Sequence, residues 1–100
     1  MLRAVCLIIR EPNTIWMQFL DQFKTYDVYV VIDNNNWKPK YFNTLYPNIH
    51  FFQIDDNKCQ QTGFYNSSVT MNLKPVISWD KALYFFTNVC TKYEQIWFLE

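Results

Sequence analysis

The stretch "RAVCLII" at residues 3–9 determines how the rest of the chain is interpreted. After Arg3 every side chain is apolar, and the run is too short to form a stable helix of its own. A continuous apolar run of this kind is typical of a strand that is buried on both faces, as in a parallel sheet. Helices must then cover both faces, so the sequence predicts an α/β fold.

Three more strands are expected along the chain. The β-branched and aromatic runs at 28–32, at "IHFFQID" (49–55) and at 95–99 have the length and composition of strands. They alternate with helical segments, which favours right-handed crossovers between parallel neighbours. We therefore predict one domain over residues 1–100, with a Rossmann-like three-layer α/β/α architecture and a mostly parallel sheet of order 3-2-1-4.

The predicted helices are recognised by their caps and their spacing. Asn13 is a candidate N-cap for a helix from Thr14 to about Thr25, whose apolar face includes Ile15 and Phe19. A short helix is expected within "KPKYFNTLYP" (38–47). Ser78 is the candidate N-cap of the last helix, and its apolar positions at helical spacing are Trp79, Ala82, Leu83, Phe86, Val89 and Cys90. Between the third strand and this helix, we expect a polar, irregular loop at 57–77.

Composition excludes several classes of function. The 100 residues are 50% hydrophobic and carry nine basic and nine acidic side chains, so the net charge is zero. A basic surface for nucleic acid is therefore not expected, and no apolar segment is long enough to span a membrane. The first apolar run is short and lacks a cleavage site, so we interpret it as the first strand rather than as a signal peptide, and localisation stays open. The three cysteines lack zinc spacing and are interpreted as reduced thiols.

Charged residues follow the end of every predicted strand, and they are the candidate site. Ligands of open α/β sheets bind beyond the carboxyl ends of the strands, where the strand order reverses, here between the first and fourth strands. Polar residues also simply begin where strands end, and this simpler interpretation stands beside the functional one. The charged residues at the strand ends are Arg10, Glu11, Asp33, Asp55, Asp56 and Glu100.

The turn after the first strand limits the choice of ligand. It reads "REPN" (10–13), and the only glycine of the chain is Gly63, so a glycine-rich dinucleotide fingerprint and a P-loop are both absent. An acidic edge instead suits a divalent cation that neutralises a diphosphate. An acid at the end of the second strand can bind donors of a ribose or a base.

This layout resembles the nucleotide-sugar-binding half of GT-A-fold glycosyltransferases. The similar segments are "RAVCLIIRE" (3–11), "VYVVIDNNN" (28–36), "IHFFQIDD" (49–56) and "SWDKALYFF" with "YEQIWFLE" (78–86 and 93–100). The resemblance implies a nucleotide-diphosphate sugar donor, an acceptor of unknown class, and Mn²⁺ or Mg²⁺ held by an Asp-x-Asp-type motif that follows the last strand. It also implies that the chain is the N-terminal piece of a longer enzyme, which alone is inactive.

The resemblance assigns roles to individual residues of this sequence. Arg10 and Glu11 resemble the loop that touches the nucleotide base, and Asp33 resembles the acid that contacts the base or ribose. Asp80 and Lys81 resemble polar residues near the donor sugar or diphosphate, with a solvated helix position as the alternative for Lys81. A further residue, at the end of the last strand, is the metal-ligand candidate, Glu100.

Other candidates are given weaker roles or none. Trp79 is interpreted as a core anchor rather than a platform for a sugar, and His50 receives no role. No catalytic base is assigned. The alternative function is a non-enzymatic α/β module for nucleotide binding or protein interaction. The apolar strand at 95–99 would form the edge of the sheet, where a strand from a missing C-terminal half or from a second copy is expected to pair with it.

Overall fold

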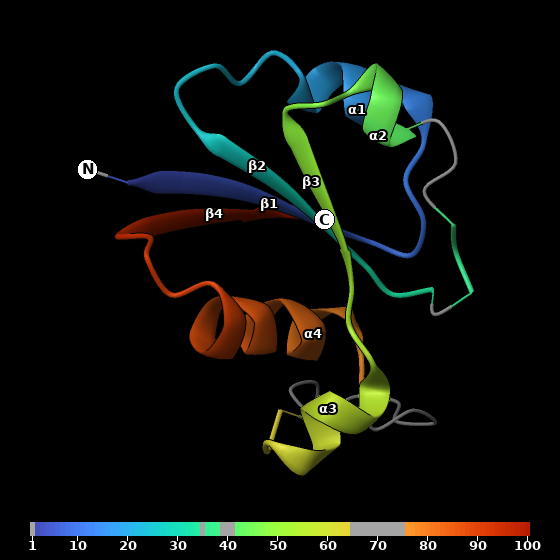
Figure 1. The fold of residues 1–100 in the computed structure, drawn as a ribbon, viewed down its shortest axis with the longest axis vertical. Helices are drawn as coiled ribbons and strands as arrows, with labels where there is room; N and C mark the ends of the chain where they lie inside the picture. Colours follow the sequence, from blue (N-terminus) through green and yellow to red (C-terminus); the bar gives the residue numbers. More distant parts are fainter. Residues whose placement is uncertain (1, 35, 39–41, 65–75) are drawn as a thin grey trace.

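The core of the molecule is a sheet of four parallel strands (Figure 1), seen in a computed structural model that describes residues 2–34, 36–38, 42–64 and 76–100. The strands are β1 (Arg3–Ile9), β2 (Asp27–Ile32), β3 (Ile49–Gln53) and β4 (Gln95–Leu99). Their order is β3-β2-β1-β4, and all three pairings are parallel. The predicted fold class and strand order are confirmed.

The continuous apolar character of β1 follows from its central position. Successive side chains of a strand point to opposite faces of the sheet. Val5 and Leu7 belong to one hydrophobic cluster, while Ala4, Cys6 and Ile8 belong to the other. All five are at most 5% exposed. Because each face of β1 is covered by a layer of its own, neither set of alternate positions can be polar.

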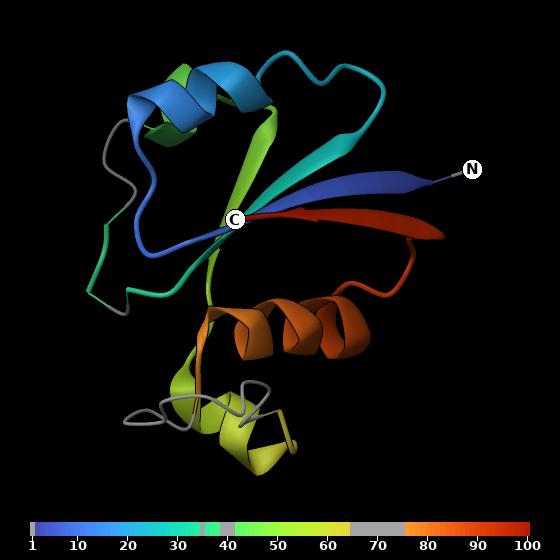
Figure 2. The same ribbon diagram turned by 180° about the vertical axis from the view of Figure 1, so that it is seen from behind.

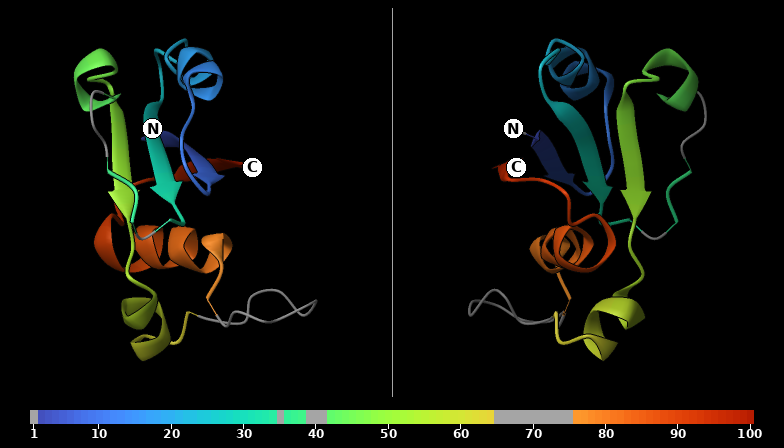
Figure 3. Two further views of the ribbon diagram at one scale, coloured as in Figure 1. Left: turned by 90° about the vertical axis from the view of Figure 1, so that its right-hand side faces the viewer. Right: turned by 60° about the vertical axis from the view of Figure 1, so that its left-hand side comes forward.

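Helices cover the two faces of the sheet (Figures 1 and 2). On one face lie α1 (Thr14–Leu20) and α2 (Phe42–Leu45). On the other lies α4 (Ser78–Tyr84), which continues as a π-helical turn, η1 (Phe85–Val89). The short helix α3 (Asp56–Gln61) lies beyond the end of β3 and beside α4, as the side views in Figure 3 show. None of the helices in the described ranges is long and apolar enough to cross a bilayer.

Helix α1 is shorter than predicted. Its N-cap is Asn13, as expected, because the Asn13 side chain accepts a hydrogen bond from the Trp16 backbone at 3.0 Å. After Leu20 the backbone tightens into bonds between residues three apart, such as Phe23 N to Leu20 O at 3.1 Å, and the helix ends. Ile15 was expected on the buried face but is 80% exposed.

Helix α4 and the turn after it bury part of the predicted face, including Ala82 and Phe86, but they also bury Lys81 and Phe85, which were not predicted. The N-cap is Ile77 rather than Ser78, because the Asp80 carboxylate accepts the Ile77 backbone N–H at 2.9 Å. Leu83 and Val89 are 40% and 56% exposed, although the spacing placed both in the core. The π-helical turn widens the helix at its end, where Cys90 N bonds to Phe85 O at 2.8 Å, so regular helical spacing does not hold at Val89. The buried side chains are Asp80, Lys81, Ala82, Phe85 and Phe86.

The segment predicted as an irregular loop contains a helix. Helix α3 begins after Asp55, whose carboxylate accepts the Asn57 backbone N–H at 2.9 Å. It ends before Gly63, which has a φ of +87°, a conformation that glycine adopts at little cost. The prediction of an irregular 57–77 loop is therefore wrong for its first part, and 65–75 lie outside the described residues.

At the amino ends of the strands, hydrogen bonds between hydroxyl groups join β2 to the segment before β4. Tyr93 donates its one hydroxyl proton to the Asp27 carboxylate at 2.6 Å. The Tyr93 oxygen can then only accept, so Tyr29 donates to it, also at 2.6 Å. Burial raises the pKa of Tyr29 to about 12. Burial, followed by the hydrogen bond to Asp27, also holds the pKa of Tyr93 above its usual range. These neutral hydroxyls tie the segment before β4 to the start of β2.

Strand β4 lies at the edge of the sheet, as predicted. Its Phe98 packs against Trp79 and Phe86 on the α4 face, with ring centroids 5.4 and 5.9 Å away. Trp97 faces the other way and is 54% exposed. It borders an apolar groove of about 300 Å³ lined by Val5, Phe23, Tyr26, Trp97 and Leu99. Self-association through 95–99 stays a prediction, and Trp97 rather than Phe98 is the side chain that faces outward.

The stability of the fold should depend on Phe85 and hardly at all on Leu83. Phe85 is 1% exposed, and its ring centroid lies 4.3 Å from that of Phe52. Phe85→Ala should lower the free energy of unfolding by about 3–5 kcal/mol, because it leaves a cavity in the core. Leu83→Ala, on the exposed side of the same helix, should lower it by less than about 1 kcal/mol. Urea denaturation measures both, and similar losses would contradict the buried face described for α4.

Candidate functional site

The carboxyl ends of β1, β2 and β4 meet at one edge, as the sequence predicted. In the strand registers, Ile9 pairs with Ile32 and Leu7 pairs with Leu99. The pairing continues past the strands, because Asp33 N bonds to Ile9 O at 3.0 Å. Asn34 N also bonds to the carbonyl oxygen of Arg10 at 3.1 Å. The residues that follow β1 and β2 are therefore held side by side at this edge.

Lys81 is the central charged residue at this edge, and it is completely buried. Its Nζ lies 3.0 Å from Asp33 Oδ1 and donates to the Asp33 carbonyl oxygen at 3.2 Å. The same Nζ lies 2.8 Å from Asp56 Oδ1. The alternative of a solvated helix position for Lys81 is wrong, since its side chain is 0% exposed. An ammonium can be buried in this way only when carboxylates compensate its lost hydration.

The two carboxylates are held differently. Asp33 meets Lys81 through both its side chain and its backbone carbonyl, and its side chain is 16% exposed. Asp56 is 34% exposed. Despite the short distance to Lys81, no donor in the described part of the chain has hydrogen-bond geometry toward Asp56 Oδ1. We therefore treat the Lys81–Asp56 contact as an attraction between charges rather than a directed bond.

The side chain of Asp80 serves its own helix. It is 2% exposed, and its carboxylate accepts the Ile77 backbone N–H at the start of α4. A carboxylate in this position satisfies a backbone group of the helix terminus and also suits its positive dipole end. Its role near a donor sugar stays a prediction, whereas its role in starting α4 is visible in the structure.

A pocket lies on the α2 side of the same edge. It has a volume of about 370 Å³ and is lined by Glu11, Pro12, Asn34, Asn36, Trp37, Lys38 and Phe42. Of the residues named from the sequence, Glu11 is in this lining. Arg10 is exposed, and the contact that places it is the bond of its carbonyl oxygen with Asn34.

Two residues that the sequence analysis missed shape this pocket. Trp37 is half-buried, and its ring centroid lies 6.3 Å from that of Phe42 and 5.8 Å from that of Phe51. Gln53, at the end of β3, donates to the carbonyl oxygens of Asn34 and Trp37 at 2.8 and 2.7 Å. A tryptophan directly after a run of asparagines was the available signal for Trp37. The role of Gln53 depends on pairing between strands, which no local pattern reveals.

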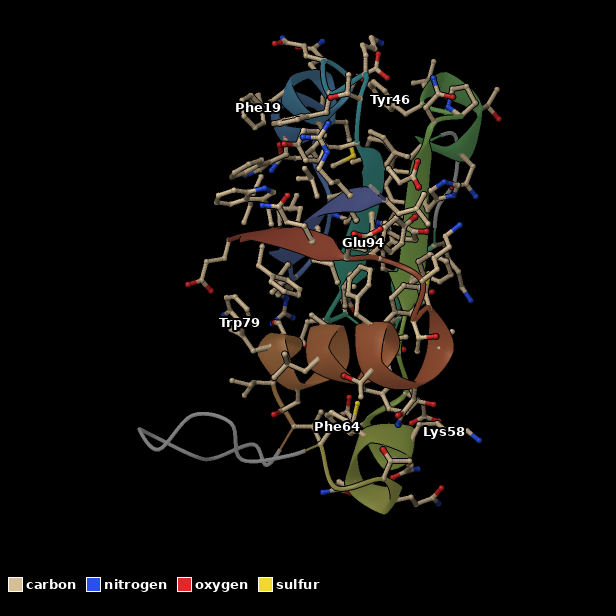
Figure 4. The ribbon with its side chains drawn as sticks, turned by 90° about the vertical axis from the view of Figure 1, so that its left-hand side faces the viewer. Phe19, Tyr46, Lys58, Phe64, Trp79 and Glu94 are labelled. Carbon is tan, nitrogen blue, oxygen red and sulfur yellow. The ribbon has the colours of Figure 1, made fainter. Side chains whose placement is uncertain are left out.

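Glu100 is tied to the start of α4 by Trp79. The Trp79 indole donates to Glu100 Oε2 at 2.8 Å, while its ring packs against Phe98. Figure 4 shows Trp79 beside the β4 ribbon, at the end of α4 where that helix begins. The interpretation of Trp79 as a core anchor is confirmed, since it packs against the core cluster on the α4 face. It also orients the predicted metal-ligand candidate.

The described residues do not assemble a divalent-cation site by themselves. Among them, no three His, Cys, Asp or Glu side chains gather closely enough to hold a metal ion. Asp33 and Asp56 are engaged by Lys81, and Glu100 is engaged by Trp79. A hard cation such as Mg²⁺ or Mn²⁺ needs several oxygen ligands in a fixed geometry. The described arrangement alone therefore does not supply the ligands of such a cation.

Comparison with family models, with curated proteins and with solved structures finds no match to this chain.

Removal of the Lys81 charge should destabilise the protein strongly. Lys81→Met would leave Asp33 and Asp56 close together without their cation. We expect the free energy of unfolding to fall by about 3 kcal/mol, at the low end for a broken buried ion pair because both acids are partly exposed. Lys58→Met is the matched control, since Lys58 lies exposed on α3 (Figure 4) and should change stability by less than about 0.5 kcal/mol. Equal effects in urea denaturation would contradict the role given to Lys81.

The three cysteines should differ in reactivity, and the reactivity of Cys59 tests how α3 packs at this edge. All three are free, and Cys6 and Cys59 are buried. Burial raises the pKa of Cys6 to about 12 and that of Cys59, beside Lys81 and Asp56, to about 11. Little thiolate is then present at pH 8, and thiolate is the reactive form. Mass spectrometry after iodoacetamide treatment should show modification at half-buried Cys90 first, and rapid modification of Cys59 would indicate that α3 is not seated as described.

Proposed function

We propose that this edge binds the nucleotide part of a nucleotide-diphosphate sugar, in a glycosyltransferase-like domain of the GT-A type. The observation that carries the proposal is the pocket lined by Glu11, Asn34 and Trp37, which adjoins the Asp33–Lys81 pair across the tip of β2. A nucleoside needs an apolar surface for its base and a few polar groups for its edges and hydroxyls. This pocket offers both.

The size of the pocket limits what it holds. About 370 Å³ is at the lower end of the range for small-molecule sites, so it suits a nucleoside rather than a whole nucleotide sugar. The diphosphate and sugar would then extend along the edge toward Lys81 and β4. Glu11 is exposed at the rim, where its carboxylate can accept hydrogen bonds from a base N–H or a ribose hydroxyl.

Sugar transfer requires more of this edge than nucleotide binding does. Displacement of a diphosphate needs positive charge where the leaving group develops its negative charge. In the described residues, the buried cation of this edge is Lys81, and the carboxylate that the resemblance offers to Mn²⁺ or Mg²⁺ is Glu100, which accepts a hydrogen bond from Trp79. We therefore propose nucleotide binding by these 100 residues, no transfer by them alone, and little effect of added metal on affinity. A non-enzymatic nucleotide-binding or protein-interaction module is the alternative, and it uses the same pocket.

Calorimetric titration with UDP and GDP, with and without Mn²⁺, tests this proposal. Glu11→Ala should weaken binding of the preferred nucleotide by about fivefold, which corresponds to one hydrogen bond of about 1 kcal/mol. Glu94→Ala is the matched control. Glu94 is exposed just before β4, at the amino ends of the strands and away from the pocket (Figure 4), so its substitution should leave the affinity unchanged. No heat with either nucleotide at millimolar concentration, or equal losses in the two variants, would overturn the proposal.

A further inference from the structure

Asp56 is the most exposed member of the charged group around Lys81. Its side chain is 34% exposed, compared with 16% for Asp33 and none for Lys81. Lys81 is thus covered in part by a carboxylate that itself reaches solvent. Of the two carboxylates that contact the ammonium, Asp56 is therefore the one that solvent reaches more readily.

The contact between Lys81 and Asp56 is less directed than the contact between Lys81 and Asp33. The Nζ–Oδ1 distance is 2.8 Å, yet Asp56 Oδ1 has no hydrogen-bond partner among the described residues. Asp33, by contrast, offers Lys81 a carboxylate and a carbonyl oxygen. Attraction without directed bonding is easier to exchange for another anion of the same charge, because little geometric fit is lost.

The carboxylate of Asp56 can leave without unfolding its helix. Asp56 is the first residue of α3, and the N-cap of this helix is supplied by its neighbour Asp55. The helix is seated elsewhere, by fully buried Cys59 and by Phe64, whose ring lies 5.8 Å from that of Tyr84 on α4 (Figure 4). Rotation of the Asp56 side chain toward solvent therefore costs the Lys81 contact but leaves the packing of α3 in place.

We propose that the Asp56 carboxylate occupies the place of an anionic oxygen of the ligand. In this position, Asp56 gates the access of the ligand to Lys81. When the edge is empty, Asp56 helps to compensate the buried ammonium. When a ligand binds, a phosphate oxygen takes this position and the Asp56 carboxylate turns into solvent. The inference rests on the proposed function for the identity of the ligand, a nucleoside diphosphate, but the gate itself concerns any diphosphate.

Removal of the Asp56 charge should strengthen the binding of a ligand that carries phosphate groups. Asp56→Asn keeps the shape of the side chain and removes its charge, so UDP and inorganic pyrophosphate should bind about fivefold more tightly, as for one partly exposed ion pair. Uridine carries no phosphate, and its affinity should not change. The same substitution in the Lys81→Met background should give no gain, because the ammonium is no longer there.

Asp55→Asn is the matched control for these titrations. It removes the same charge one residue away, and asparagine is as good an N-cap as aspartate, so the helix is preserved. Its effect on UDP affinity should stay below about twofold, as expected for a screened charge that does not touch Lys81. Equal gains in Asp55→Asn and Asp56→Asn, or an equal gain for uridine, would overturn the gate. If no variant binds a nucleotide, the proposed function fails, and pyrophosphate alone decides whether the gate holds.

Discussion

The buried ammonium of Lys81 is the constraint on which the rest of this edge depends. It lies between Asp33, which follows β2, and Asp56, which begins α3. Lys81 itself belongs to α4, so one side chain joins segments that are far apart in the sequence. A buried charge is tolerated only while its partners remain close, and this requirement fixes the position of all three segments. The loop after β2 gains a further anchor in Gln53, which places Trp37 at the pocket.

The fold was predictable from sequence because it rests on signals that are local and strong. The apolar run of β1, the asparagine cap of α1 and the alternation of strands with helices each identify one element without reference to the others. The edge position of β4 followed from the topology alone. Such features agree with one another, and agreement across levels is what makes a sequence foldable.

The predictions that failed concern choices made by tertiary contacts. Spacing placed Leu83 and Val89 in the core of the last helix, but the helix turns Lys81 and Phe85 inward instead. A lysine has no apolar signature, and its burial depends on two acids that arrive from other segments. For the same reason the sequence named Asp33 and Lys81 as separate candidates but could not show that they form one ion pair. Trp37 and Gln53 were missed because their roles arise only when β2 and β3 are side by side.

The position of β1 has a consequence for how the sheet assembles. The strand lies between β2 and β4, and its register with β4 joins Arg3 to Gln95. One neighbour is close along the chain, while the other is separated from it by nearly the whole sequence. Closing so large a loop costs entropy before any contact repays it, and parallel pairings of this kind form slowly. Strands β1, β2 and β3 can therefore pair first. The face of β1 that α4 covers then stays exposed to other chains until α4 and β4 pack against it. Apolar surface of this kind favours aggregation for as long as it is exposed.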